Sequence, residues 1–308
     1  MKTAYISHSD CLSHDTGTGH PECASRLPAI NDHLMAAQLY DFLIHYEAPE
    51  ATREQLERCH DPAYLDQVER LMPTSGHAYL DPDTVVSPGS LRAARRAAGA
   101  VVKAVDLVMD GEVRNAFCAV RPPGHHAERI RTMGFCIYGN VAVGAAHAMA
   151  VHGLERVAIL DFDVHHGNGS EDIFRRDPRV LICSSFQHPF YPYSVIEEVP
   201  DHIVCAPLAA TAKGDEFREA VTRLWLPALE RFKPQMVFVS AGFDAHADDD
   251  MSGVSLLEAD YRWVTEQIRE VAGRHASDRV VSVLEGGYDL PSLARSVEAH
   301  LRVLMDQY

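Results

Sequence analysis

The sequence contains no apolar run that approaches the ~20 residues of a membrane-spanning helix. Its first residues lack the longer apolar region of a secretory signal peptide, so a cytoplasmic location is the default expectation. No long tract rich in proline, glycine or serine marks a linker. The 308 residues, of which 46% are hydrophobic, are therefore expected to form one domain, 1–308, around a large core.

Basic residues are scarce, since 28 Lys and Arg face 44 Asp and Glu and the formal net charge is −16. Nucleic-acid binding depends on Lys and Arg at the phosphates, so it is not expected; an acidic surface suits cationic substrates better. The seven cysteines form no C-x-x-C pair, and several lie in apolar runs. We expect reduced thiols in or near the core rather than disulfides.

Apolar, β-branched runs alternate with helical patterns along the chain. The predicted strands are 3–7, 116–120, 157–160, 180–184, 236–240 and 280–284. Apolar residues recur at helical spacing over 91–109, over 141–151 and in a segment that ends near Gly273. Pro227 predicts a kink or break in the helical pattern of 217–232. The alternation predicts an α/β protein with a mainly parallel central sheet.

Chemically reactive side chains follow directly on these predicted strands. The clusters are RPPGHH at 121–126, DFDVHH at 161–166, SFQH at 185–188, GFDAH at 242–246 and EGGY at 285–288. In open parallel sheets, ligands bind outside the carboxyl ends of the strands. We therefore expect the five clusters to form one active site.

The cluster at 161–166 indicates a metal site. In extended backbone, alternate side chains point the same way, so Asp161, Asp163 and His165 can converge. A helix cap needs a single acceptor, whereas four ionisable groups within six residues are costly to bury without an ion or hydrogen bonds. Carboxylate and imidazole ligands suit zinc or a similar divalent ion. The third ligand is expected at another strand end, where Asp244 is the strongest candidate.

Zinc held by two carboxylates and a neutral imidazole is expected to polarise a carbonyl and to lower the pKa of bound water. His125 and His126 follow a rigid Pro-Pro-Gly turn, so they are candidates for the general base and the general acid. Asp161 can orient one imidazole and Asn168 the other. Tyr288 offers a phenol that can donate to the tetrahedral oxyanion.

The motifs RPPGHH, GFC, DFDVHHGNG, SAGFDAH and EGGY occur in this order. With them the chain resembles the zinc-dependent histone deacetylase superfamily, and most closely its class II and bacterial deacetylase-like amidohydrolase branch, from His20 to Tyr288. The resemblance implies the arginase/deacetylase fold, a single-domain three-layer α/β/α arrangement. It also implies one zinc ion per chain on Asp163, His165 and Asp244, with His126 as principal base and acid, His125 as its electrostatic partner held by Asp161, and Tyr288 as the carbonyl-polarising phenol.

Further sites follow from the resemblance alone. It implies one structural potassium site at Asp161, Asp163, His165, Ser185 and Phe186, and a second at Phe174, Asp177 and Val180. It implies a substrate site formed by Gly134, Phe135, Tyr191, Met251, Gly286 and Gly287. Relatives often form dimers or tetramers, so a homo-oligomer is one expectation. Asp250-Met251 stands where many relatives have Pro-Leu, and the apolar Met251 replaces the glutamate of a polyamine-selective relative, which favours acyl-lysine or a neutral amide.

The expected function is zinc-dependent hydrolysis of an N-acetyl or related acyl amide, with acetyl-lysine in a peptide or protein as the expected substrate. An acetylpolyamine deacetylase is the alternative that the acidic charge also suits. Two further alternatives are a manganese ureohydrolase, because DAHAD at 244–248 mimics a binuclear motif, and a non-catalytic acyl-lysine binding protein. The first of these would want an aspartate where Asn168 stands. Neither nucleic acid nor a membrane is an expected partner.

Overall fold

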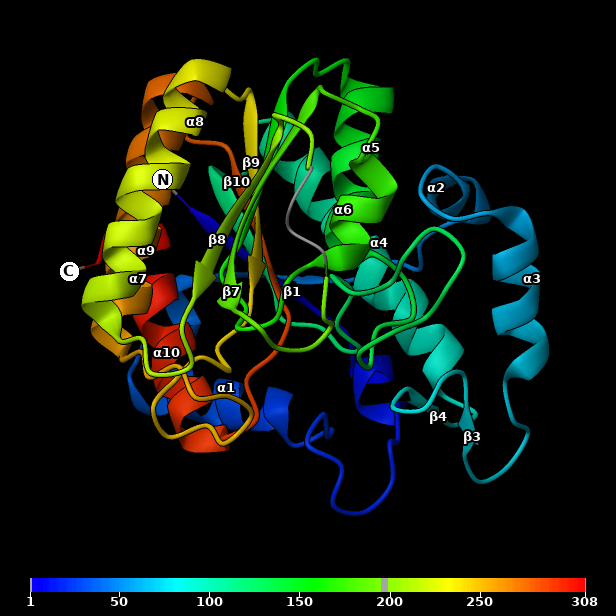
Figure 1. Ribbon diagram of the computed structural model, residues 1–308. Coiled ribbons are helices and arrows are strands. Elements are labelled where there is room, and N and C mark those ends of the chain that lie inside the picture. Colours follow the sequence, from blue (N-terminus) through cyan, green and yellow to red (C-terminus); the bar gives the residue numbers. More distant parts are fainter. Residues whose placement is uncertain (1, 195–198, 308) are drawn as a thin grey trace.

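The computed structural model describes residues 2–194 and 199–307. Its centre is an eight-stranded sheet in the order β2-β1-β5-β10-β9-β6-β7-β8 (Figure 1). The strands are β1 (Thr3–Ser7), β2 (Ile44–Glu47), β5 (Asn115–Cys118), β6 (Val157–Asp161), β7 (Val180–Gln187), β8 (Ile203–Leu208), β9 (Met236–Ala241) and β10 (Val280–Leu284). All neighbouring strands of this sheet are parallel, which confirms the predicted sheet.

Helices cover both faces of the sheet and give the three layers of the predicted α/β/α fold (Figure 1). One face carries α1 (Arg26–Ala36), α7 (Gly214–Ala220), α8 (Leu226–Phe232), α9 (Glu258–His275) and α10 (Leu290–Leu304). The other carries α4 (Ser90–Met109), α5 (Asn140–His152) and α6 (Asn168–Phe174), and α2 (Arg53–Glu57) and α3 (Pro62–Leu71) lie farther out on that side. No helix in the described part of the chain is long and apolar enough to cross a membrane.

The six strands predicted from apolar runs are all present; β1 and β10 have the predicted boundaries, and the other four shift at one or both ends by one to three residues. The largest shifts are in β5, which ends at Cys118 instead of residue 120, and in β7, which continues to Gln187. The cysteines are free thiols, and only Cys23 and Cys205 are not fully buried, as predicted. The central strands form because every one of their side chains is buried, on both faces of the sheet.

Four strands were not predicted. The edge strand β2 alternates half-buried and exposed residues and is only four residues long. The opposite edge strand, β8, contains Pro207, which an edge strand tolerates because the missing N–H faces away from the ladder. The remaining two, β3 (Ala78–Tyr79) and β4 (Val85–Val86), form a small antiparallel hairpin. Strands β2, β3 and β4 lack the apolar run on which the prediction depended, and the apolar run of β8 is interrupted by Pro207.

The predicted helices are present as α4, α5 and α9. Helix α9 continues past Gly273 to His275. The predicted break near Pro227 is found as a π-helical stretch, η3 (Val221–Trp225), between α7 and α8, with Pro227 in the first turn of α8. Two short 3₁₀ turns, η1 (Ser9–Ser13) and η2 (Tyr40–Phe42), complete the elements.

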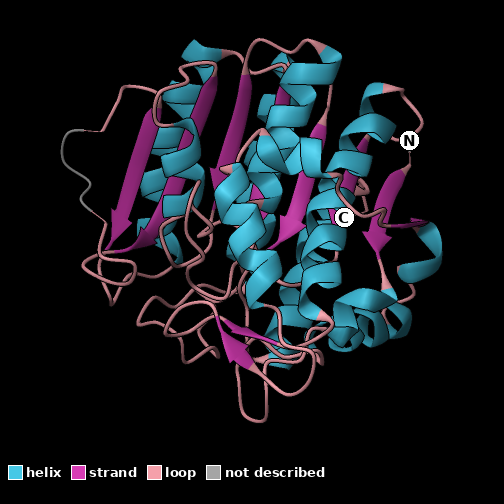
Figure 2. Ribbon diagram, turned by 90° about the vertical axis from the view of Figure 1, so that its right-hand side faces the viewer, coloured by secondary structure: helices cyan, strands magenta, loops and turns pink. Residues whose placement is uncertain are grey.

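The strands all run toward one edge of the sheet. In Figure 2 their arrowheads point to the lower edge, where long loops and the β3–β4 hairpin gather. Since the strands are parallel, the segments that follow β5, β6, β7, β9 and β10 meet at this edge. Four of the five reactive clusters lie at these strand ends and in the segments that follow them, whereas Ser185 to Gln187 of the fifth lie within β7 itself.

Candidate active site

Three metal-ligand candidates meet at the carboxyl edge of the sheet. Asp163 and His165 follow β6, and Asp244 follows β9, the strand paired with β6. All three side chains are buried, and their ligand atoms lie within 4.8 Å of one another. Nδ1 of His165 lies 3.0 Å from Oδ1 of Asp163 and 3.1 Å from Oδ2 of Asp244. The structure thus brings together the three residues that the sequence proposed as zinc ligands.

The charges of Asp163, His165 and Asp244 favour the binding of a cation between them. Burial opposes the charge on His165, but Asp163 and Asp244 outweigh it and raise the pKa of His165 to about 10. Burial, together with the charge of Asp163, raises the pKa of Asp244 to about 7. Oδ2 of Asp244 accepts no hydrogen bond from the described residues. Two buried carboxylates, one of them with an unsatisfied oxygen, and one imidazole nitrogen fit a divalent cation such as zinc.

Two glycines allow the backbone to approach these ligands. A Cβ on Gly242 would lie 2.0 Å from Oδ2 of Asp163, and one on Gly286 would lie 2.3 Å from Oδ2 of Asp244. The N–H of Gly286 donates to Oδ2 of Asp163 at 2.9 Å. Gly286 therefore supports the ligands from behind and is not among the residues that line the cavity, nor is Gly287, whose carbonyl accepts from Nε of Arg26 at 2.7 Å.

The two histidines after β5 have different partners. Nδ1 of His125 lies 2.9 Å from Oδ2 of Asp161, and Nδ1 of His126 lies 2.7 Å from Oδ1 of Asn168. Nδ2 of Asn168 donates to Oε1 of Glu128 at 2.8 Å, which turns the amide oxygen toward His126. His126 must then donate through Nδ1, so its Nε2 keeps a free lone pair. Glu128 was not predicted, because it occupies a loop with no distinctive pattern.

The pKa values of the pair diverge. Burial disfavours a charge on His125, but Asp163 and Asp161 overcome it and hold the pKa of His125 well above its usual value. Burial, reinforced by the charge of His125, holds the pKa of His126 well below its usual value. The arrangement therefore favours a protonated ring at His125 next to a neutral ring at His126.

Glu285 fastens the histidine loop to the end of β10. Its Oε2 accepts the backbone N–H of Gly124 at 2.6 Å and that of His125 at 3.1 Å. The hydroxyl of Ser240 donates to the other oxygen at 3.2 Å. Sequence analysis included Glu285 in the EGGY motif but gave it no role, because a backbone partner leaves no mark in the sequence.

Tyr288 faces the cavity beside the metal-ligand candidates. The guanidinium of Arg26 lies over its ring, 5.1 Å from the centroid, and Phe135 meets it edge to face at 6.0 Å. Burial is the main reason that the pKa of Tyr288 lies well above its usual value. The phenol is therefore protonated and can donate a hydrogen bond.

A cavity of about 210 Å³ opens onto this group. It is lined by Asp83, His126, Gly134, Phe135, His165, Phe190, Tyr191, Met251 and Tyr288. Four predicted substrate-site residues, Gly134, Phe135, Tyr191 and Met251, are among them. A Cβ on Gly134 would lie 2.3 Å from the ring of His126, so only glycine fits there. Asp83 and Phe190 were missed, since the hairpin that presents Asp83 was not predicted and Phe190 has only its neighbour Tyr191 as a signal.

The residues named for potassium lie at two places. Asp161 ends β6 beside β7, where Ser185 and Phe186 are buried, so the first set is assembled around the metal-ligand segment. The second set forms the turn from α6 into β7, in which Asp177 N–H donates to the carbonyl of Phe174 at 2.9 Å and Val180 N–H to that of Asp177 at 3.1 Å.

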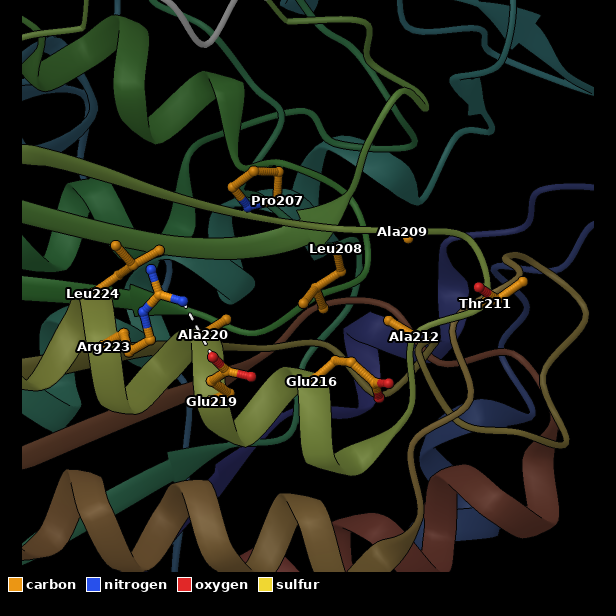
Figure 3. A pocket seen from close by; sticks show the side chains of 10 residues that line it. All are labelled: Pro207, Leu208, Ala209, Thr211, Ala212, Glu216, Glu219, Ala220, Arg223 and Leu224. Carbon is orange, nitrogen blue, oxygen red and sulfur yellow. Dashed lines mark hydrogen bonds and ion pairs between the residues drawn. The ribbon is translucent and has the colours of Figure 1, made fainter.

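A larger hollow lies away from this chemistry. It measures about 380 Å³ and lies between the end of β8 and α7 (Figure 3). Its polar side chains include Glu216 and the ion pair of Glu219 with Arg223, at 3.1 Å. No histidine or cysteine is among its lining residues, and none of the candidate site residues lies there.

Comparison with known proteins agrees with this geometry. Residues 20–304 match the histone deacetylase domain family. The chain is 38% identical to the histone deacetylase-like amidohydrolase of Pseudomonas aeruginosa, covering 93% of this chain and 82% of that protein. It is 40% identical to the uncharacterized protein slr0245 of Synechocystis sp., covering 98% and 99%. It is 35% identical to the polyamine deacetylase HDAC10 of Mus musculus, covering 99% of this chain but 48% of that protein.

A solved structure shares the fold. The crystal structure of the HDA15 HD domain superposes with a TM-score of 0.93 at 33% sequence identity, covering 99% of this chain and 90% of the other. The family match extends from before α1 to the end of α10 and so includes all the site residues described above. The chain therefore belongs to the histone deacetylase family.

Proposed function

We propose that this chain is a zinc-dependent deacetylase that hydrolyses N-acetyl or related acyl amides, with acetyl-lysine in a peptide or protein as substrate. The observation that carries the proposal is the single cavity that His126, Tyr288 and the metal-ligand candidate His165 all line. Its aromatic lining, Phe135, Phe190 and Tyr191, suits the methylene chain of an acylated lysine.

The metal would be held by Asp163, His165 and Asp244. Zinc bound there would supply Lewis-acid chemistry, polarising the amide carbonyl and lowering the pKa of a water molecule beside it. The side chains themselves fix the geometry, because Oδ1 of Asp244 accepts the N–H of Val164 at 3.0 Å and Oδ1 of Asp163 that of His165 at 2.9 Å. These bonds hold both carboxylates before any ion arrives.

His126 would move the proton. Its neutral ring keeps a free lone pair on Nε2, so it can take a proton from the attacking water and pass it to the leaving amine nitrogen. Protonated His125 lies directly behind it, with ring centroids 4.0 Å apart. His125 lowers the basicity of His126 and therefore makes it a better acid in the second step. Tyr288 would donate to the developing oxyanion of the substrate.

The direct test is hydrolysis of a fluorogenic acetyl-lysine peptide by the zinc-loaded protein. We expect turnover that is inhibited by a hydroxamate, and loss of activity when the metal is removed. If folded, zinc-loaded protein releases product from neither this peptide nor other acyl amides, the proposal is wrong.

Acetylpolyamine deacetylation is the second candidate. The similarity to the HDAC10 polyamine deacetylases of mouse and human favours it, as does the carboxylate of Asp83 in the cavity wall, which could meet a substrate ammonium group. Met251 in the same wall brings no charge. The ratio of kcat/KM for acetylspermidine to that for the acetyl-lysine peptide decides between the two substrates.

Structural potassium ions remain a proposal that rests on family resemblance. Oxygen ligands suit such hard cations, and the buried Asp161 carboxylate and Ser185 hydroxyl offer them at the first site. Activity and melting temperature measured in potassium and in a large organic cation test it.

A further inference from the structure

Asp249 is a buried carboxylate that accepts three backbone N–H groups. Its Oδ2 accepts from Tyr288 at 2.6 Å and from Asp289 at 3.1 Å, and its Oδ1 accepts from Met251 at 3.0 Å. The residue is 5% exposed. It lies in the loop that follows β9, whereas Tyr288 and Asp289 lie in the loop that follows β10. One carboxylate therefore joins two loops of the carboxyl edge.

Both loops supply a wall of the same cavity. Tyr288 lines it from one loop and Met251 from the other. Asp249 does not line the cavity, so it cannot contact a substrate there. Its bonds instead fix the main chain from which the two lining side chains project. The guanidinium of Arg26 packs over the ring of Tyr288, 5.1 Å from its centroid, and Arg26 also donates to the carbonyl of Gly287. The backbone nitrogen of Tyr288 is held instead by Asp249.

We propose that Asp249 is a positioning residue that sets where the Tyr288 phenol lies in the cavity and how far it is from Met251. The inference rests on the proposed function, in which that phenol donates to the substrate oxyanion. Such a donor acts only at hydrogen-bonding distance from the oxyanion, and a displacement of about 1 Å can cost roughly 10²-fold in rate. Three charge-assisted bonds to one carboxylate are suited to preventing that displacement.

The first experiment replaces Asp249 with asparagine. Asn keeps the volume but has one acceptor oxygen, so it can serve either the Tyr288 and Asp289 groups or the Met251 group, and its NH2 then faces a backbone N–H. We expect kcat on the acetyl-lysine peptide to fall roughly tenfold or more. The matched control is Asp250→Asn. It removes the same charge from the exposed side chain of the next residue, and it should leave kcat within about twofold.

A double-mutant cycle distinguishes positioning from a general structural role. If Asp249 acts through the phenol, Asp249→Asn should lower kcat less than about twofold when Tyr288 is already phenylalanine. A loss of kcat that is large in the parent and small in the Tyr288→Phe background supports the proposal. An equal loss of kcat in both backgrounds, or no loss in the parent, overturns it.

Hydrogen–deuterium exchange tests the contact without relying on activity. In Asp249→Asn we expect faster exchange of the amides of Tyr288 and Asp289, and no change there in Asp250→Asn. Unchanged exchange at both amides overturns the proposal even if activity falls. If the parent protein hydrolyses no acyl amide, the proposed function fails by itself, and the exchange rates alone decide whether Asp249 holds this loop.

Discussion

Tyr288 is the residue on which the proposed chemistry depends most directly, through its phenol. It differs from phenylalanine by one hydroxyl, and the packing of its ring against Arg26 and Phe135 would survive that change. We expect Tyr288→Phe to lower kcat by roughly 10²- to 10³-fold with little change in KM, since an oxyanion donor acts in the transition state. Steady-state kinetics with an unchanged zinc content checks this. A variant as fast as the parent would remove Tyr288 from the mechanism.

Gly286 tests the metal centre separately from catalysis. A Cβ at this position would lie 2.3 Å from Oδ2 of Asp244 and 2.6 Å from Oδ2 of Asp163. Because both carboxylates must move, Gly286→Ala is expected to lower the affinity for zinc by roughly 10-fold or more. Zinc content after dialysis against a chelator of graded concentration measures the effect.

Gly273→Ala is the matched control. Gly273 lies inside α9, and its added methyl would meet only Oδ1 of Asp278, at 3.2 Å, on a side chain that can turn away. We expect zinc affinity to be unchanged and stability to rise by roughly 0.5–1 kcal/mol. Equal zinc affinity in the two variants would contradict the placement of Gly286 against the ligands.

The side chains of the candidate site were more predictable than the contacts that hold them. Asp163, His165, Asp244 and both histidines could be named because carboxylates and imidazoles directly after apolar strands are rare without a function. Glu128, Asp249 and Glu285 act through an amide or through backbone N–H groups. Which backbone group a carboxylate reaches depends on how two distant loops pack, and neither spacing nor residue type records that.

At the scale of elements, His60 joins the turn between α2 and α3 to the loop before α5. Its Nδ1 donates to the carbonyl of Glu128 at 3.0 Å, and its Nε2 accepts the N–H of Gly139 at 2.9 Å. A second proton on the ring would have to sit on Nε2, opposite the N–H of Gly139. Burial lowers the pKa of His60 to about 4.

This junction should make the protein sensitive to mild acid. The folded-state pKa of about 4 lies below the ordinary value of 6.5, so the unfolded chain binds more protons between these values. The contribution of His60 is complete above pH 6.5 and is lost as the pH falls toward 4. It should amount to about 2 kcal/mol between pH 7.5 and pH 5. His60→Gln should reduce the pH dependence of urea unfolding by that amount; an unchanged dependence would contradict it.

The same scale shows why the central strands were predicted and the edges were not. Strands β6, β9 and β10 are buried on both faces, so their sequences are continuous apolar runs. Strand β2 needs only one covered face, and its pattern of four residues is too short to recognise. Strand β8 contains Pro207, which normally argues against a strand. The strands of the main sheet that the sequence did not predict are therefore its two edges.

For the whole molecule, the net charge of −16 sets the long-range field. We expect kcat/KM for an acetyl-lysine peptide flanked by arginines to fall several-fold between low salt and 0.5 M NaCl, because salt screens the attraction between the peptide and the protein. A peptide of the same length without charged flanks should change little. Equal salt dependence of the two peptides would show that the acidic surface does not guide substrates.

The order of the strands also has a consequence for synthesis of the chain. Strand β10, which is made after the other seven strands of the sheet, lies between β5 and β9 in its middle. While residue 280 is still inside the ribosome, the sheet can exist only as two halves, β2-β1-β5 and β9-β6-β7-β8. Each half has an open edge that can pair with another chain. Asp163, His165 and Asp244 are already present at that stage, but Tyr288 is not. An unfinished polypeptide could thus capture a cation before it could carry out any reaction.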